Sequence, residues 1–195
     1  MSLLRRFYAL KSVYRFGSVG VGPKKRKESA AEHTWSAMIL ADYFLDILEK
    51  NSDRKTRPKL DRLKVYELLL YHDIVEIEAG DLSIHLEEER KNKKASEQAA
   101  MNKLIKELPQ NMRPKILALF KEFESQNTVE ARFARAVDRL DGQLHELDYP
   151  DDWKGWGEEN LRRYLKNSNY DEFPEIKEMF EEFVVFAREN GYFDE

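Results

Sequence analysis

One short stretch, Tyr66 to Glu76, constrains the fold more than any other part of the chain. Its sequence, YELLLYHDIVE, is apolar on nearly every side, which is typical of a helix buried in the middle of a protein. The stretch nevertheless contains His72 beside Asp73, with Glu76 one helical turn after His72. Burying such groups without partners would cost roughly 2–7 kcal/mol each, and more for an ionised carboxylate. We therefore expect a compensating group, and a bound metal cation is the working hypothesis.

The rest of the chain predicts an all-α fold. Of its 195 residues 36% are charged, only eight are glycine and six proline, and the charges recur within periodic segments. The length suits a single domain covering residues 1–195. Helices are expected at about 2–14, 30–50, 60–79, 87–108, 116–123, 129–147, 158–166 and 173–190.

The start of the second helix has the clearest local signal. Ser29 to Glu32 is a capping-box pattern, so the helix should begin near Ala30 and place His33 in its second turn. Before it, residues 15–27 read as a glycine-rich basic loop, and residues 82–85 read as an irregular crossing segment. The inward side of the second helix is expected to be Trp35, Met38, Ile39, Ala41, Phe44, Leu45 and Leu48.

Charge and composition exclude several classes of protein. A net charge of −4 gives no global basic field for nucleic acid. The chain has no cysteine, so disulfides, thiolate metal sites and cysteine nucleophiles are ruled out. We expect a soluble cytoplasmic protein, since we find neither a membrane-spanning apolar run nor a signal peptide. The run Lys24 to Lys27 is a solvated charge cluster or a nuclear-import tag, and beside a metal it would attract an anionic substrate.

Candidate metal ligands come from three predicted helices. His33, His72, Asp73 and Asp138 form a mixed nitrogen and oxygen set, which suits Mn²⁺, Co²⁺, Fe²⁺, Ni²⁺ or Zn²⁺. Such a set leaves coordination positions open for water and substrate. The spacing alone is not specific, and from the dipeptide alone a metal-free buried His–Asp pair would be favoured.

The extended motifs resemble a known family. Glu32-His33-Thr34, then HDIVEIEAGD from His72 to Asp81, then Asp138 within a helix, follow the order found in the HD-domain metal-dependent phosphohydrolases. The pattern is most similar to the branch of the 5′-deoxynucleotidases and their HD-domain-containing relatives. The resemblance covers about residues 1–147, which would be the metal-site core, and leaves about 148–195 as a C-terminal helical extension.

The resemblance implies a role for each matching residue. His33, His72, Asp73 and Asp138 would hold one divalent metal, with Co²⁺ or Mn²⁺ favoured over Mg²⁺, Zn²⁺, Ni²⁺ and Fe²⁺. The metal would polarise a phosphoryl oxygen and activate water. The other residues would be Glu76 as general base or water-orienting group, Asp81 as partner of the nucleophile or leaving oxygen, Arg15 as phosphate ligand, and Phe16 beside the sugar.

Two features of the resemblance bear on specificity and assembly. The branch commonly has tryptophan after its phosphate-binding arginine, whereas this chain has Phe16, which puts the preference for deoxyribose in doubt. The branch also implies a homodimer, for which residues 116–123 or the C-terminal helices would supply apolar surface.

Alternatives remain open for several residues. Asp141 and His145 lie on the same helical stripe as Asp138, and Asp138 could be a surface ion-pair partner. His145 and His85 read as ordinary polar residues that could line the substrate cleft. Single-residue alternatives are a polar helix edge for Glu76, a plain turn for Asp81 and a helix-terminal charge for Arg15.

Two further functions remain possible. The same metal ligands could hydrolyse nucleoside di- or triphosphates or guanosine-tetraphosphate-type signalling nucleotides. The chain could also be a non-catalytic metal- or nucleotide-binding helical protein.

Overall fold

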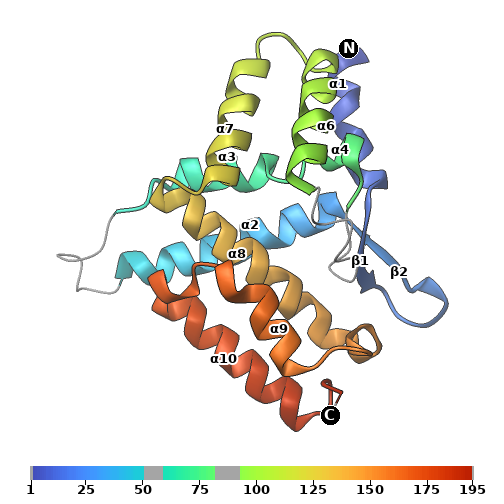
Figure 1. The fold of residues 1–195 in the computed structure, drawn as a ribbon, viewed down its shortest axis with the longest axis vertical. Helices are drawn as coiled ribbons and strands as arrows, with labels where there is room; N and C mark the ends of the chain where they lie inside the picture. The colour runs from blue at the N-terminus through green and yellow to red at the C-terminus, as the bar shows by residue number, and fades with distance from the viewer. Residues whose placement is uncertain (1, 51–58, 82–92, 195) are drawn as a thin grey trace.

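The computed structural model describes residues 2–50, 59–81 and 93–194, and Figure 1 shows that helices dominate them. The all-α prediction is confirmed for these residues, with one two-stranded hairpin as the exception. The elements are α1 (Ser2–Arg5), the 3₁₀ helix η1 (Arg6–Ser12), β1 (Tyr14–Val19), β2 (Arg26–Ser29), α2 (Ala30–Lys50), α3 (Arg62–Tyr71), α4 (Glu76–Ala79), α6 (Lys93–Glu107), α7 (Arg113–Ser125), α8 (Val129–His145), α9 (Glu158–Tyr164) and α10 (Pro174–Glu189).

Three helices, α2, α3 and α8, pack against one another in the middle of the molecule (Figure 1). Their contact is apolar and includes Phe44, Leu68, Phe133 and Leu140, all of them buried. On one side α10 packs against α8, and on the other α7 packs against α3. The polar residues that these three helices share must therefore satisfy one another, because they are enclosed by apolar packing.

Helix α2 begins as predicted but presents a different face. The backbone N–H of Ser29 donates to Glu32 at 2.9 Å, which completes the capping box. Trp35 and Ile39, however, are 67% and 56% exposed, so their predicted inward orientation is wrong. The 3.6-residue period places only one face inward, and that face carries His33. The buried residues of α2 are Ala30, His33, Thr34, Ala37, Ala41, Phe44 and Leu45.

The helix predicted at 60–79 is interrupted at the metal-ligand candidates. Helix α3 ends at Tyr71, residues 72–75 form a turn, and α4 starts at Glu76. Gly80 ends α4 with a φ of +74°, a conformation that glycine adopts readily. His72 and Asp73 therefore lie at the end of a buried helix, from which both can reach the centre of the molecule.

The loop predicted at residues 15–27 is instead an antiparallel hairpin. Strands β1 and β2 pair Ser18 with Lys27 and Val19 with Arg26. Gly20, in the connection, has a φ of +79°, and a Cβ there would lie 2.6 Å from the Lys24 carbonyl oxygen. The strands are short, six and four residues, and lack the apolar alternation that predicts sheet, while the connection between them is rich in glycine and lysine, which explains why the pattern predicted a loop.

Exposed apolar surface is found on one of the two segments expected to carry it. The apolar side of α7, which includes Ile116 and Phe120, is buried within the chain. The C-terminal helix α10 does expose Val185 and Phe186, at 44% and 46%. A further exposed apolar stripe lies on α2, at Trp35, Ile39 and Tyr43. Among the described residues, no helix has the length and apolarity needed to cross a membrane. Residues 51–58, between the helices predicted at 30–50 and 60–79, lie outside the described residues. So do residues 82–92, which include the predicted crossing segment at 82–85 and the start of the helix predicted at 87–108.

Candidate metal centre and active site

Donor atoms from three helical segments converge between α2, α3 and α8. Ligand atoms of His33, His72 and Asp73 all lie within 4.8 Å of one another. Asp138 of α8 brings its Oδ1 to 3.0 Å from His33 Nε2 and 3.5 Å from His72 Nε2. The four residues predicted as metal ligands are thus neighbours, although His33 and Asp138 are 105 positions apart in sequence.

The two imidazole rings are held so that both turn the same nitrogen toward this point. His33 Nδ1 lies 2.9 Å from Asp141 Oδ2, and His72 Nδ1 lies 2.6 Å from the carbonyl oxygen of Leu69. Both oxygens only accept hydrogen bonds, so each Nδ1 carries a proton and donates it. In the neutral rings each Nε2 then keeps a lone pair, and the two Nε2 atoms are 3.3 Å apart.

The donor set fits a divalent cation. Two imidazole lone pairs and the carboxylates of Asp73 and Asp138 meet in a buried position. All four groups are electron-rich, so a positive charge among them is needed to stabilise the cluster. Burial opposes protonation of His72, yet Asp73 and Asp138 outweigh it and raise its pKa well above the usual value. The cluster attracts positive charge strongly, and a mixed nitrogen and oxygen set suits a transition metal.

Asp141, which the sequence offered as an alternative to Asp138, has a definite place of its own. Its Oδ2 accepts from His33 Nδ1 and, at 2.8 Å, from the hydroxyl of Ser36. A carboxylate behind a metal-binding histidine fixes the tautomer and the ring orientation. The signal was present in the sequence, because Asp141 lies three residues after Asp138 on the same side of a helix.

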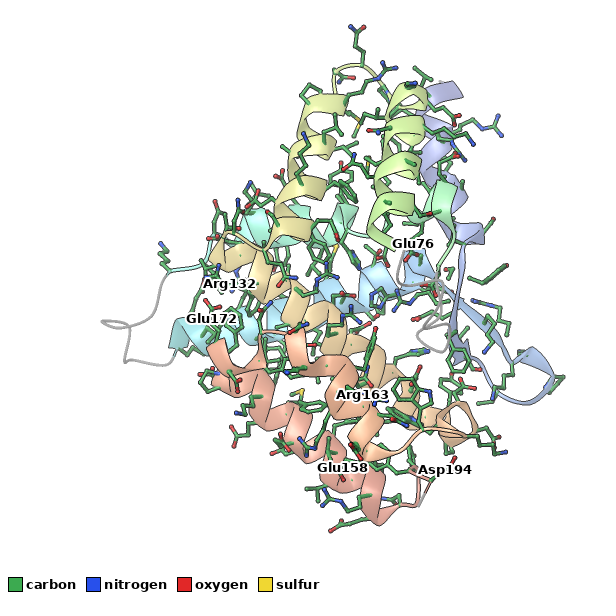
Figure 2. All side chains as sticks on the ribbon, viewed as in Figure 1. Glu76, Arg132, Glu158, Arg163, Glu172 and Asp194 are labelled. Atoms are coloured by element: carbon green, nitrogen blue, oxygen red, sulfur yellow. The ribbon has the colours of Figure 1, made fainter. Side chains whose placement is uncertain are left out.

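Glu76 is enclosed next to the metal-ligand candidates. Glu76 is 7% exposed, and one of its carboxylate oxygens, Oε2, is buried without a hydrogen-bond partner among the described residues. Burial first, and then the charges of Asp73 and Asp81, raise its pKa well above the usual value. Figure 2 shows Glu76 on α4, near the start of α2. A buried carboxyl with a free oxygen and a raised pKa is typical of a general base.

Arg15 and Phe16 lie on the hairpin rather than at the end of a helix. Arg15 Nη1 is 3.1 Å from Asp73 Oδ2, which brings the guanidinium to the edge of the metal-ligand cluster. Phe16 packs under the ammonium group of Lys27 and borders a small cavity, and its place beside the sugar stays a prediction. Asp81, directly after Gly80, acts electrostatically on Arg15 and Glu76. His85 lies outside the described residues.

The geometry can be compared with known proteins. The sequence profile described as "HD domain" matches residues 7–182. The chain belongs to the HD-domain family. Within this HD-domain protein the match covers the hairpin, every candidate ligand and most of the C-terminal helices, so the family extends beyond the region in which motifs are visible.

Individual relatives have the same character. The chain is 26% identical over 151 residues to the 5′-deoxynucleotidase HDDC2 of Homo sapiens, covering 77% of this chain and 68% of that protein. It is 26% identical over 172 residues to the 5′-deoxynucleotidase hdd1 of Schizosaccharomyces pombe, covering 86% and 80%.

Solved structures agree with the sequence relatives. A predicted metal-dependent phosphohydrolase of Magnetospirillum magnetotacticum superimposes with a TM-score of 0.80 at 29% identity, covering 100% of this chain and 94% of that one. An HD-domain phosphohydrolase of Listeria innocua, at 22% identity and a TM-score of 0.60 over 94% of this chain and 82% of that one, shares the fold. The chain is therefore an HD-domain phosphohydrolase.

Proposed function

We propose that this HD-domain phosphohydrolase cleaves nucleoside 5′-monophosphates, with deoxynucleotides as the favoured substrates, to nucleoside and phosphate. The observation that carries the proposal is the ion pair between Arg15 and Asp73 at 3.1 Å, which brings the guanidinium that we propose as the phosphate ligand next to a candidate metal ligand. An arginine fork suits bidentate binding of a terminal phosphate. The relatives named 5′-deoxynucleotidase support this substrate class.

The cation would be held by His33, His72, Asp73 and Asp138, with Asp141 orienting His33. One divalent metal ion is proposed, Co²⁺ or Mn²⁺ ahead of Mg²⁺, Zn²⁺, Ni²⁺ and Fe²⁺. When bound, it supplies Lewis acidity toward a phosphoryl oxygen.

The chain's own carboxylates would move the protons. Glu76 would accept the proton of the attacking water, since its Oε2 has no partner among the described residues and its pKa is raised by burial. Asp81 would hydrogen-bond the nucleophile or protonate the 5′-oxygen as the phosphorus–oxygen bond breaks. Arg15 would neutralise charge on the phosphate and keep it beside the metal.

A second substrate class is favoured by the basic residues of the hairpin. The Lys27 ammonium group lies 4.4 Å from the centre of the ring of Phe16, the residue that follows Arg15. Lys25, on the same hairpin, is exposed. These charges suit a longer phosphate chain, as in nucleoside di- and triphosphates or guanosine-tetraphosphate-type nucleotides. A homodimer is also proposed, supported by the exposed apolar stripe of Trp35, Ile39 and Tyr43 on α2.

The test is a phosphate-release screen of mono-, di- and triphosphates of ribo- and deoxynucleosides, each with Co²⁺, Mn²⁺, Mg²⁺ or Zn²⁺. The proposal predicts release of inorganic phosphate from monophosphates, fastest from deoxynucleotides with Co²⁺ or Mn²⁺. Release from di- or triphosphates alone would replace it with the second class. Nucleotide binding without phosphate release under every metal would indicate a binding protein.

A further inference from the structure

The hairpin that carries Arg15 is irregular next to the metal-ligand cluster. Tyr14 pairs with Ser29 and Ser18 pairs with Lys27, so three residues of β1 (Arg15, Phe16 and Gly17) face one residue of β2, Glu28. Such bulges re-aim side chains and are frequent beside active sites. Glu28 is therefore the cross-strand neighbour of the segment that presents Arg15.

Glu28 is a buried carboxylate between two basic side chains. It is 4% exposed, its Oε2 lies 3.5 Å from Arg15 Nε, and its Oε1 lies 3.7 Å from His145 Nδ1. His145 comes from the end of α8 and donates from Nε2 to the Ser18 carbonyl oxygen at 2.7 Å. The bulged strand is thus tied to α8, the helix that carries Asp138.

Gly17 permits this close approach. A Cβ at position 17 would lie 3.1 Å from Cδ2 of His145, so a larger residue would push the ring away. Asp138, Asp141 and His145 follow one stripe of α8, and each contacts a different part of the site. One helix therefore sets the position of the candidate metal ligands and of the hairpin together.

The two carboxylates that contact Arg15 do so at different nitrogens of the guanidinium. Asp73 contacts Nη1 and belongs to the candidate metal ligands, so its charge is shared with the cation when one is bound. Glu28 faces Nε, on the other side of the guanidinium, and lies outside the ligand group. With Glu28 at Nε and Asp73 at Nη1, Nη2 is the nitrogen left to meet a phosphate.

We propose that Glu28, supported by His145, is a positioning residue that holds Arg15 in the orientation that binds the substrate phosphate. The inference rests on the proposed function, because it requires Arg15 to bind phosphate. Glu28 itself touches no reacting atom.

A double-mutant cycle tests whether Glu28 acts through Arg15. Glu28→Gln keeps the side-chain volume and removes the charge, and it should raise KM for a deoxynucleoside monophosphate roughly tenfold with kcat nearly unchanged. The Ki of inorganic phosphate should rise in parallel. Arg15→Ala should raise KM at least as much, and adding Glu28→Gln to it should have little further effect. Glu172→Gln breaks a distant Glu–Arg pair, with Arg132 (Figure 2), and serves as the matched control.

Equal effects of Glu28→Gln with and without Arg15 would overturn the proposal, as would loss of kcat or metal with KM unchanged. If Glu28→Gln does not fold, Glu28→Asp carries the same cycle with the charge kept and one methylene removed. If the parent hydrolyses no monophosphate, the proposed function fails, and the cycle is read from the affinity of inorganic phosphate by calorimetry. A phosphate affinity independent of Arg15 and Glu28 would then refute the positioning role.

Discussion

The candidate metal ligands and the phosphate-binding arginine are held in different ways. His33, His72 and Asp138 lie on long helices or at their ends, enclosed in apolar packing, and the side chain of His33 is fully buried. Arg15 lies on a short irregular hairpin, and its side chain is 21% exposed. A metal site demands a rigid ligand set, while a substrate site must remain open. Substitutions in the helices should therefore affect metal binding, and substitutions at the hairpin should affect substrate binding or local stability.

The largest effect is expected in the helical region. Asp73→Ala removes a candidate ligand and leaves the Arg15 guanidinium without its partner at the cluster. Metal binding and phosphate release should be lost together, and the loss in turnover should exceed that of any other variant here. Metal analysis of the purified variant with an activity assay checks this. Retained metal with lost turnover would assign Asp73 to the reaction rather than to the metal.

Glu76→Gln should lower kcat by roughly 10²–10⁴-fold, the usual contribution of a general base. The metal should stay bound, because Glu76 is outside the group of converging ligand atoms. Parallel measurement of kcat and metal content checks both statements. A variant as fast as the parent would exclude Glu76 as the base.

Asp141→Asn should weaken metal affinity by roughly 10–100-fold, the usual cost of losing a partner behind a metal-binding histidine. His33 would lose the carboxylate that fixes its proton on Nδ1. Competition with a chelator measures the change. Activity at saturating metal should largely recover, whereas an unrecoverable loss would indicate a direct role in the reaction.

Glu146 reports on the hairpin side of the site, because it lies next to Gly17 and directly follows the end of α8. Burial, and then the nearby Asp152, raise the pKa of Glu146 to about 8, so the folded state disfavours its ionised form. The folded state therefore binds this proton more tightly than the unfolded chain does. The full stability of the fold is present below the unfolded pKa of Glu146, and part of it is lost as the pH rises through about 8.

Glu146→Gln stays neutral, so between pH 5 and pH 9 the parent should lose about 1–3 kcal/mol of unfolding free energy relative to this variant. Urea unfolding at several pH values measures the difference. The exposed Glu189→Gln variant serves as a control for the simple loss of a carboxylate. Parallel stability curves for the parent and Glu146→Gln would contradict the burial argument.

Sequence reasoning succeeded where the signal was local. The capping box of Ser29 and Glu32 fixed the start of α2, and the motif around His72 indicated a polar cluster inside apolar packing. Trp35 was predicted to face inward because it is a large apolar residue. It lies two positions from His33 in α2, so when His33 faces the core Trp35 points to solvent. The helical spacing placed Asp141 on the same stripe as Asp138, but its partner His33 lies 108 positions away, so only the structure shows what it does there. Glu28 contacts Arg15 and His145 from other elements, and no local pattern reports those contacts.

The number of metal ions bound per chain decides whether the four candidate ligands form one site. Equilibrium dialysis of the purified chain against Co²⁺, with the bound metal counted per chain, should give one tightly bound ion for the parent. His72→Ala and Asp138→Ala should each abolish that binding while the chain stays folded. A parent that binds no ion, or variants that keep the parent stoichiometry, would contradict a single metal held by His33, His72, Asp73 and Asp138.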